Sequence, residues 1–284
     1  MNFFGGSSFH HQSKKVVFIT GCDEGIGRAT AIELHSLGYV VIAGCLTDNG
    51  VSSLNEEKPG VRAEKCDVTV EEDIVRIASM VKTEYRGRLH CLVNNAGVVV
   101  SSHVLIAPLE SAIETVSVNL LGTMRVTKIM LPLLVDNEGS RIVFLSSVCG
   151  LCPLWGGSSY SASKFGIEGF ARVLRDELGG FGVSVSIMNP STTDTGMSRG
   201  YAHSLKMRFQ EAPDDVKSLF GHDYGDRCFE HYSPRIKQVS CSVRVPVSSI
   251  CHAVGSRKPK ARYYCGFAAK TLFRLAYVFP GFCS

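Results

Sequence analysis

The sequence lacks the features that mark a secreted or membrane-spanning protein. No charged segment leads into an apolar run at the N-terminus, so no secretory signal is readable, and the eleven cysteines suggest free thiols in a reducing, intracellular compartment. No window reaches the ~18 uninterrupted apolar residues that a spanning helix needs. The first thirteen residues contain no Asp, Glu, Lys or Arg, and we expect residues 1–14 to form a flexible lead.

Acidic residues are absent after Glu230, whereas nine Lys or Arg follow it, so the C-terminal part carries the excess of the net charge of +4. Within residues 257–284, aromatic and aliphatic side chains are interleaved with Lys270 and Arg274. This pattern is typical of a segment at a membrane interface rather than of a nucleic-acid arm. We therefore expect peripheral contact with an ER or mitochondrial membrane and no nucleic-acid partner. The alternative is a C-terminal helix that caps the core of a cytoplasmic protein.

Apolar strand-like runs alternate with helical patterns along most of the chain. The strands are expected at residues 15–20, 39–44, 90–97, 141–147 and 183–190, and the helices at 26–37, 71–85, 109–134 and 160–178. Such alternation predicts an α/β fold with a parallel sheet of about seven strands and helices on both faces. The length and the hydrophobic share of 45% suit a single domain over residues 15–284. The pattern fails after residue 190, and residues 197–232 are interpreted as a substrate-covering insertion.

In a parallel sheet of this kind, ligands bind beyond the carboxyl ends of the strands. The first strand runs into TGCDEGIG, which places Gly21, Gly25 and Gly27 at a strand-to-helix turn. The missing Cβ atoms let the backbone approach a pyrophosphate, and the helix N-terminus offers unpaired N–H groups to it. The spacing alone also fits an ordinary glycine-rich turn.

Hydroxyl chemistry is indicated by Tyr160 and Lys164, which lie four residues apart and therefore on one face of the expected helix. A nearby ammonium favours the phenolate, so we expect Lys164 to lower the pKa of Tyr160 and make it a proton acceptor. Ser147 follows the strand RIVFL and can donate a hydrogen bond to a substrate oxygen; Ser146 is the competing choice. Taken alone, the Tyr–Lys pair also fits a solvated helix face.

Several motifs together resemble the short-chain dehydrogenase/reductase family. They are TG-x-x-x-G-x-G, the NNAG at 94–97, Asn119 in VNLLGT, the thirteen-residue interval from Ser147 to Tyr160, and Y-x-x-x-K. TGCDEGIG, AGCLTDNG and the late KPKARYYCG…LFRLAYVFPG also resemble the branch of retinol dehydrogenases, 17β-hydroxysteroid dehydrogenases and 3-hydroxybutyrate dehydrogenase. The resemblance implies a Rossmann-type fold, a nicotinamide cofactor and an alcohol or ketone substrate.

The resemblance also assigns roles to individual residues. It implies that Thr20 to Gly27, with Ile26 among them, cradle the diphosphate, that Asp67 contacts adenine, and that Asn94 and Gly97 line the adenosine side. Asp67 could equally cap a helix or form a turn. Thr195 matches the position that contacts the nicotinamide carboxamide. Lys164 is implied to hold the nicotinamide ribose, and Asn119 to anchor a water that connects Lys164 to solvent.

The end of the second expected strand bears on the choice between NAD and NADP. An acid often binds the ribose 2′-OH of NAD there, but this chain has Cys45, Leu46 and Thr47. A cation for the 2′-phosphate of NADP is also missing from that turn. Glu24 is expected to lie near it and to repel phosphate. NAD is therefore preferred over NADP.

Two features depart from the simplest interpretation. Ser191 stands where the family usually has glycine, and a positive φ there would strain it.

Cys149 and Cys152 form a Cys-x-x-Cys pair, which is typical of thiol exchange or of a zinc site. Thiol exchange is disfavoured because the helix that should follow directly begins too late, and zinc is disfavoured because no further ligands are evident. We expect no metal, and we expect this loop to shape the substrate pocket.

The leading hypothesis is an NAD-dependent enzyme that interconverts an alcohol and its carbonyl on a lipophilic substrate such as a steroid or retinol, with Asn119, Ser147, Tyr160 and Lys164 in the catalytic set. A small 3-hydroxy acid is the alternative substrate, and Arg199 or Lys206 could bind its carboxylate. An inactive nucleotide-binding scaffold and a thiol oxidoreductase centred on Cys149 are the alternatives of another class. Family members are often homodimers or homotetramers, which is the assembly that the resemblance implies.

Overall fold

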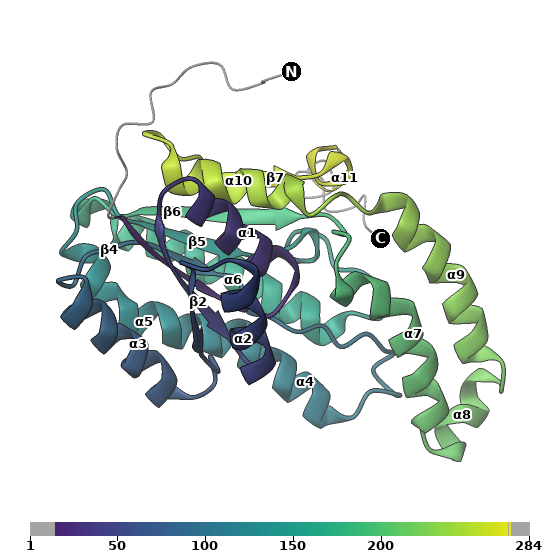
Figure 1. Cartoon of the computed structure of the whole chain (residues 1–284). Coiled ribbons are helices and arrows are strands. Elements are labelled where there is room, and N and C mark those ends of the chain that lie inside the picture. Colours follow the sequence, from purple (N-terminus) through teal and green to yellow (C-terminus); the bar gives the residue numbers. More distant parts are fainter. Residues whose placement is uncertain (1–14, 272, 274–284) are drawn as a thin grey trace.

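Seven parallel strands form the centre of the structure (Figure 1). The computed structural model describes residues 15–271 and 273, so the expected lead at 1–14 and most of 272–284 lie outside the described residues. The strands are β1 (Val16–Thr20), β2 (Val40–Cys45), β3 (Arg62–Lys65), β4 (Leu89–Asn94), β5 (Arg141–Leu145), β6 (Ser184–Pro190) and β7 (Arg262–Cys265). Their order is β3-β2-β1-β4-β5-β6-β7. The order reverses between β1 and β4, and ligands of such sheets bind beyond the carboxyl ends of the strands at this reversal.

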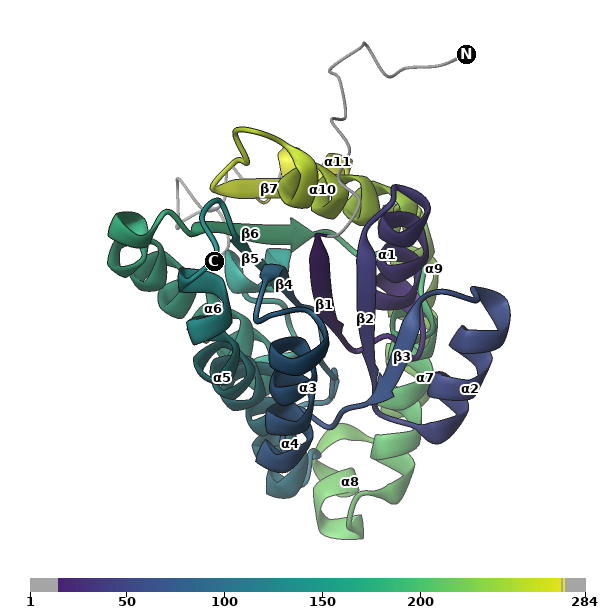
Figure 2. The ribbon, with the colours of Figure 1, turned by 60° about the vertical axis from the view of Figure 1, so that its left-hand side comes forward.

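Helices cover both faces of the sheet (Figure 2). One face is covered by α1 (Gly25–Ser36), α2 (Asp48–Glu57) and α10 (Arg244–Gly255), and the other by α3 (Glu71–Glu84), α5 (Thr123–Val135) and α6 (Ser158–Glu177). Successive strand residues enter opposite layers, so Phe18 packs in one apolar cluster while Val17 and Ile19 pack in the other. Because both faces are covered, the inner strands β1, β2, β4 and β5 are mostly apolar, whereas the edge strand β3 is largely charged. The predicted fold class is confirmed; α2 was not predicted.

The stretch Leu109–Val135 is a continuous helical segment of 27 residues, formed by α4 (Leu109–Val116), a π-helical turn (Ser117–Gly122) and α5. By length and composition alone it is apolar enough to cross a membrane, which the count of uninterrupted apolar residues did not predict. Its most apolar window is 44% buried inside the protein, and α5 lies against α3 and β4. This helix therefore serves as part of the cover of the sheet.

The segment expected to cover the substrate consists of helices. They are α7 (Gly196–Glu211), α8 (Asp214–Phe220) and α9 (Tyr224–Val239), which stand beyond the carboxyl edge of the sheet (Figure 1). A small apolar cluster of Ile106, Phe209 and Ala212 joins α7 to the loop after β4. After α9 the regular pattern resumes with α10, β7 and the short α11 (Phe267–Lys270).

Candidate active site

The turn between β1 and α1 has the backbone that a pyrophosphate cradle needs. Gly21 and Gly25 have φ values of +71° and +64°, a region that side chains disfavour. A Cβ on Gly27 would lie 2.2 Å from the carbonyl oxygen of Gly21 and 2.4 Å from the Asn95 amide nitrogen. The turn can thus be built only with glycine at these positions, and it leaves the first N–H groups of α1 at the sheet edge.

Asn95, which the sequence analysis missed, holds this turn. Its side-chain nitrogen donates to the carbonyl oxygens of Thr20 and Gly21, both at 2.9 Å, and its backbone N–H donates to the Thr20 hydroxyl at 3.0 Å. Asn94 instead points into the core and donates to the Thr127 hydroxyl at 2.9 Å. Neighbouring residues at a strand end face opposite sides, so only one asparagine of the NNAG motif could reach the turn.

An acid does lie at the end of β2, contrary to expectation, but it comes from the glycine-rich turn. The Asp23 carboxylate accepts hydrogen bonds from the backbone N–H groups of Leu46 and Thr47 at 2.7 and 2.9 Å, and from the Thr47 hydroxyl at 2.7 Å. Glu24, whose side chain was expected there, precedes α1 and instead points to the start of α7, where its carboxylate oxygens are 2.6 Å from a Cβ built on Gly196. The two acids thus sit on opposite sides of the turn.

The two cations beside the β2 end are already paired. Arg28 binds Glu57, with its NH2 nitrogen 2.6 Å from the carboxylate, and it also donates to Ser53 at 3.0 Å. Lys65 at the end of β3 is 2.9 Å from the carboxylate of Asp48. A 2′-phosphate placed here would be repelled by Glu57 and Asp48, the acids that pair with these cations.

The remaining residues expected at the cofactor lie around the same edge. Asp67 accepts hydrogen bonds from the backbone N–H and hydroxyl of Thr69 at 2.8 and 2.7 Å, which makes it a turn former here. Ile26 packs against the apolar cluster under α1. Thr195 precedes α7, and its methyl carbon lies 3.4 Å from a Cβ built on Gly25. The start of α7 therefore contacts the glycine-rich turn.

Ser147, Tyr160 and Lys164 come together where β5 meets α6. The Lys164 ammonium donates to the carbonyl oxygen of Leu145 at 2.7 Å, and it lies 5.5 Å from the centre of the Tyr160 ring. The Ser147 hydroxyl accepts a hydrogen bond from the backbone N–H of Cys149 at 3.1 Å, and its side chain also hydrogen-bonds with that of Tyr160. The arrangement predicted from the Ser–Tyr–Lys spacing is therefore geometrically present.

Asn119 is fully buried in the π-helical turn between α4 and α5. Its amide forms two hydrogen bonds with the backbone of Val98, at 2.7 and 2.9 Å, and it donates to the Ser163 hydroxyl at 3.0 Å. A Cβ on Gly97 would lie 3.1 Å from the Asn119 oxygen and 3.7 Å from the Lys164 ammonium. Asn119 and Gly97 thus border the lysine, and π-helical turns of this kind are frequent at functional sites.

The electrostatics of the pair differ from expectation. Loss of solvent around the half-buried phenol raises the pKa of Tyr160 above its usual range, and Cys149 adds to this, whereas the Ser147 side chain acts in the opposite direction. Burial lowers the pKa of Lys164 to about 8, against the upward effects of Cys149 and Glu168. The prediction that Lys164 lowers the pKa of Tyr160 is therefore wrong for this state, because loss of solvent is the largest effect on the phenol and raises its pKa. At neutral pH the phenol keeps its proton.

The Cys-x-x-Cys pair is not a dithiol. Cys149 is a free thiol, and burial raises its pKa. Cys152 is disulfide-bonded, and Cys149 is not its partner. The expectation of free thiols is thus wrong for Cys152, although nine other cysteines in the described part of the chain are free. Within the same residues, no group of three or more His, Cys, Asp or Glu could hold a metal ion.

Ser191 is accommodated without strain. Arg86 is the one non-glycine residue with positive φ in the described ranges, so Ser191 does not adopt the conformation that would strain it. It is buried, and its hydroxyl donates to the carbonyl oxygen of Cys265 at 3.2 Å. The glycine of the family pattern is replaced here by a serine that joins β6 to β7.

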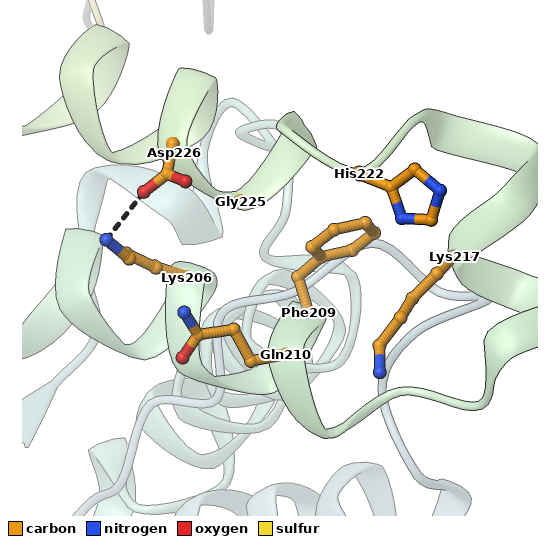
Figure 3. Close-up of a pocket in the computed structure, with 7 residues that line it drawn as sticks. All are labelled: Lys206, Phe209, Gln210, Lys217, His222, Gly225 and Asp226. Carbon is orange, nitrogen blue, oxygen red and sulfur yellow. Dashed lines mark ion pairs between the residues drawn. The ribbon is translucent and has the colours of Figure 1, made fainter.

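The two cations considered for a hydroxy-acid substrate each face an acid. Lys206 lines a cavity of about 180 Å³ between α7, α8 and α9, with its ammonium 2.5 Å from the Asp226 carboxylate (Figure 3). In this cavity Lys217 and His222 lie on the other side of Phe209 from that pair (Figure 3). Arg199 is 3.4 Å from the Asp194 carboxylate. Both cations would have to leave these partners to bind a substrate carboxylate.

Comparisons with known proteins agree with this geometry. Residues 15–206 match the family described as short chain dehydrogenase. The chain belongs to this family. It is 37% identical to the 17-beta-hydroxysteroid dehydrogenase type 6 of Bos taurus, over 93% of this chain and 84% of that protein. It is 36% identical to the retinol dehydrogenase 7 of Rattus norvegicus, over 96% and 87%.

The comparison with solved structures shows the same fold at lower identity. A short-chain dehydrogenase from Streptomyces avermitilis superposes with a TM-score of 0.76 at 24% identity, over 95% of this chain and 94% of that one. One from Burkholderia cenocepacia, in complex with NADP, has a TM-score of 0.72 at 24% identity, with 95% of each chain covered. The protein is therefore an oxidoreductase of a family that binds a nicotinamide cofactor.

The glycine-rich turn gives a direct test of cofactor binding. Gly27→Ala should abolish binding of NADH, because the added methyl group would displace the Gly21 carbonyl and the Asn95 amide that shape the turn. Fluorescence titration with NADH measures the affinity, and circular dichroism checks the fold. The control is Gly169→Ala on α6, where no atom lies within 4 Å of the added carbon. Normal NADH affinity in a folded Gly27→Ala variant would contradict the assignment.

Proposed function

We propose that this chain is an NAD(H)-dependent dehydrogenase that interconverts a secondary, or retinoid-type primary, alcohol and its carbonyl on a lipophilic substrate. The observation that carries the proposal is the convergence of Ser147, Tyr160 and Lys164 at the end of β5, across the carboxyl edge from the glycine-rich turn. The turn and the reactive hydroxyls lie at the same edge, so one bound dinucleotide can span both.

In the direction of reduction, Tyr160 donates its proton to the substrate oxygen and Ser147 donates a hydrogen bond to the same oxygen. The raised pKa of Tyr160 keeps the proton available for this step. The Lys164 ammonium stabilises the phenolate that forms. In oxidation the phenolate takes the hydroxyl proton back.

The cofactor would be held by the backbone from Thr20 to Gly27 at its diphosphate and by Lys164 at its nicotinamide ribose, with Thr195 near the carboxamide. The fit rests on the space that the glycines leave and on the exposed start of α1. When bound, it supplies or accepts the hydride. Asn119 would hold a water beside Lys164, so that protons can pass between the lysine and solvent.

NAD is the proposed cofactor because acids surround the site of the adenosine ribose. Asp23 caps the end of β2, and the cations nearby, Arg28 and Lys65, are bound to Glu57 and Asp48. A 2′-phosphate would add charge to this acidic surrounding without an unpaired Arg or Lys among these residues to balance it.

A lipophilic substrate is supported by the relatives named for hydroxysteroids and retinol and by the lining beside the active site. A cavity of about 130 Å³ lies between the loop after β4, the start of α4 and the start of α6, which is the helix that carries Tyr160. Its lining is mostly apolar: Val100, Val104, Ala107, Pro108, Leu109 and Ala112, with Ser102, Ser158 and Ser159. A 3-hydroxy acid is less well served, because Arg199 and Lys206 are paired with aspartates.

The alternatives of another class have less support. An inactive nucleotide-binding scaffold would not need Ser147, Tyr160, Lys164 and Asn119 to stay together. A thiol oxidoreductase centred on Cys149 would need a reactive thiolate, whereas burial raises the pKa of this thiol.

Two further proposals concern partners. The basic and apolar C-terminal segment would contact the surface of an ER or mitochondrial membrane. Sedimentation with anionic liposomes at low and high salt tests this contact.

Exposed apolar side chains lie on α4, α5 and α6, and they would be covered in a homodimer or homotetramer. Among them are Leu109, Ile113, Met124, Phe165 and Val173. Analytical ultracentrifugation measures the oligomeric state.

The substrate proposal is tested by a screen for cofactor reduction. Retinol, hydroxysteroids and 3-hydroxybutyrate should be offered to the full chain with NAD and, in parallel, with NADP. We expect turnover of at least one lipophilic alcohol and a higher kcat/KM with NAD. Exclusive turnover of 3-hydroxybutyrate would contradict the substrate class, and a clear advantage for NADP would contradict the cofactor.

The pH dependence of carbonyl reduction should follow Lys164. Its pKa in the folded protein is lowered to about 8, so the ammonium that stabilises the phenolate of Tyr160 is present below that pH and is lost above it. We expect kcat for reduction to be level at lower pH and to fall as pH rises through about 8. Stopped-flow oxidation of NADH measures the profile. A level profile up to the ordinary lysine range near ~10.4 would contradict this role.

A further inference from the structure

A buried ion pair joins β7 to α6 behind the active site. The Arg262 guanidinium lies 2.6 Å from one carboxylate oxygen of Glu168 and donates to the side-chain oxygen of Asn189 at 2.7 Å. The Asn189 amide nitrogen donates to the other oxygen of Glu168 at 2.6 Å. Asn189 is fully buried and Glu168 nearly so. Each of these groups has a charged or polar partner, which a buried network requires.

This network ends on the residue that polarises the substrate. The Asn189 amide nitrogen also donates to the backbone carbonyl of Ser147, at 3.0 Å. The Ser147 hydroxyl in turn accepts the backbone N–H of Cys149 at 3.1 Å. Ser147 is therefore fixed through its carbonyl on one side and through its hydroxyl on the other. Its place depends on an asparagine whose side-chain amide is held by Glu168 and Arg262.

Stability alone is a weak reason for such a pair, since a buried ion pair often adds little over apolar residues of the same size. The location of the pair beside Lys164 and Ser147 suggests a role in the active site instead. Glu168 follows Lys164 by one helical turn on the buried face of α6, and its carboxylate favours the charged form of that lysine. The charged groups that face Lys164 or Glu168 are thus Arg262 from β7 and Arg175 from α6, with the thiol of Cys149 and the phenol of Tyr160 on the active-site side.

We propose that Asn189 is a positioning residue for Ser147, and that Glu168 and Arg262 hold its amide so that strand β7 sets where the serine hydroxyl lies. The effect on rate rests on the proposed function, because Ser147 must reach the substrate oxygen as its charge develops. A small displacement of such a group costs rate without costing cofactor affinity.

The test compares Asn189→Ala with Asn137→Ala. Asn137 donates its amide to a strand carbonyl in the same way, to Leu89 at 3.0 Å, but it lies at the amino end of the sheet. For each variant we would measure kcat and KM, NADH affinity, and hydrogen exchange of the Cys149 amide within the peptide 146–152. For Asn189→Ala we expect kcat to fall about ten- to a hundredfold, with NADH affinity unchanged and exchange of the Cys149 amide about tenfold faster.

The control variant, Asn137→Ala, should lose stability without a change in kcat or in exchange of the Cys149 amide. The proposal would be overturned if Asn189→Ala lowered only thermal stability and left kcat and the exchange rate at the values of Asn137→Ala. If the unaltered protein turned over no alcohol, the proposed function would fail, but the exchange rates would still decide whether Asn189 positions Ser147.

A second variant covers the case in which Asn189→Ala does not fold. Glu168→Gln keeps the shape of the side chain but turns an amide donor toward either Asn189 or Arg262, both of which are donors. We expect the same direction of change in kcat and in exchange, with a smaller size. Glu177→Gln at the exposed end of the same helix is its control. Unchanged kcat and exchange in Glu168→Gln would overturn the proposal.

Discussion

The hydrogen bond from the Lys164 ammonium to the carbonyl oxygen of Leu145 ties α6 to the carboxyl end of β5. Because Tyr160 lies one turn before Lys164 and Ser147 lies two residues after Leu145, this bond brings both hydroxyls to the same edge. Val98 and Ser163 then connect Asn119 to the same place. The site depends on a buried cation that is held by a backbone carbonyl at the end of a strand.

Burial of this kind has a consequence for the chemistry. A low-dielectric surrounding disfavours charge on both partners, so the pKa of the phenol rises and that of the lysine falls. In this state Tyr160 is the protonated phenol and not the phenolate. Under the proposed function, such a pair would give a proton to a carbonyl in reduction and take one from an alcohol in oxidation. The positions of Tyr160 and Lys164 allow an acid–base role, and their burial decides that the phenol starts with its proton bound.

The sequence predicted the features that depend on local patterns. Continuous apolar strands predicted the parallel sheet, and the Ser147, Tyr160 and Lys164 spacing predicted three residues that do meet. It could not predict contacts between distant segments. Asn95 rather than Asn94 faces the glycine-rich turn, Asp23 reaches the end of β2, and Asn189 meets Arg262 across 73 residues. The pKa of Tyr160 was predicted in the wrong direction because spacing reveals a neighbouring charge but not the loss of solvent.

The most direct test of the account is the turnover of Tyr160→Phe, which removes one oxygen and keeps the ring. Proton transfer by a positioned side chain is worth about 10²–10⁴ in rate, so we expect alcohol oxidation and carbonyl reduction to fall by at least about a hundredfold, with NADH affinity unchanged. Tyr85→Phe at the end of α3 is the matched control. Turnover within a few-fold of the unaltered protein would show that the phenol of Tyr160 does not carry the proton.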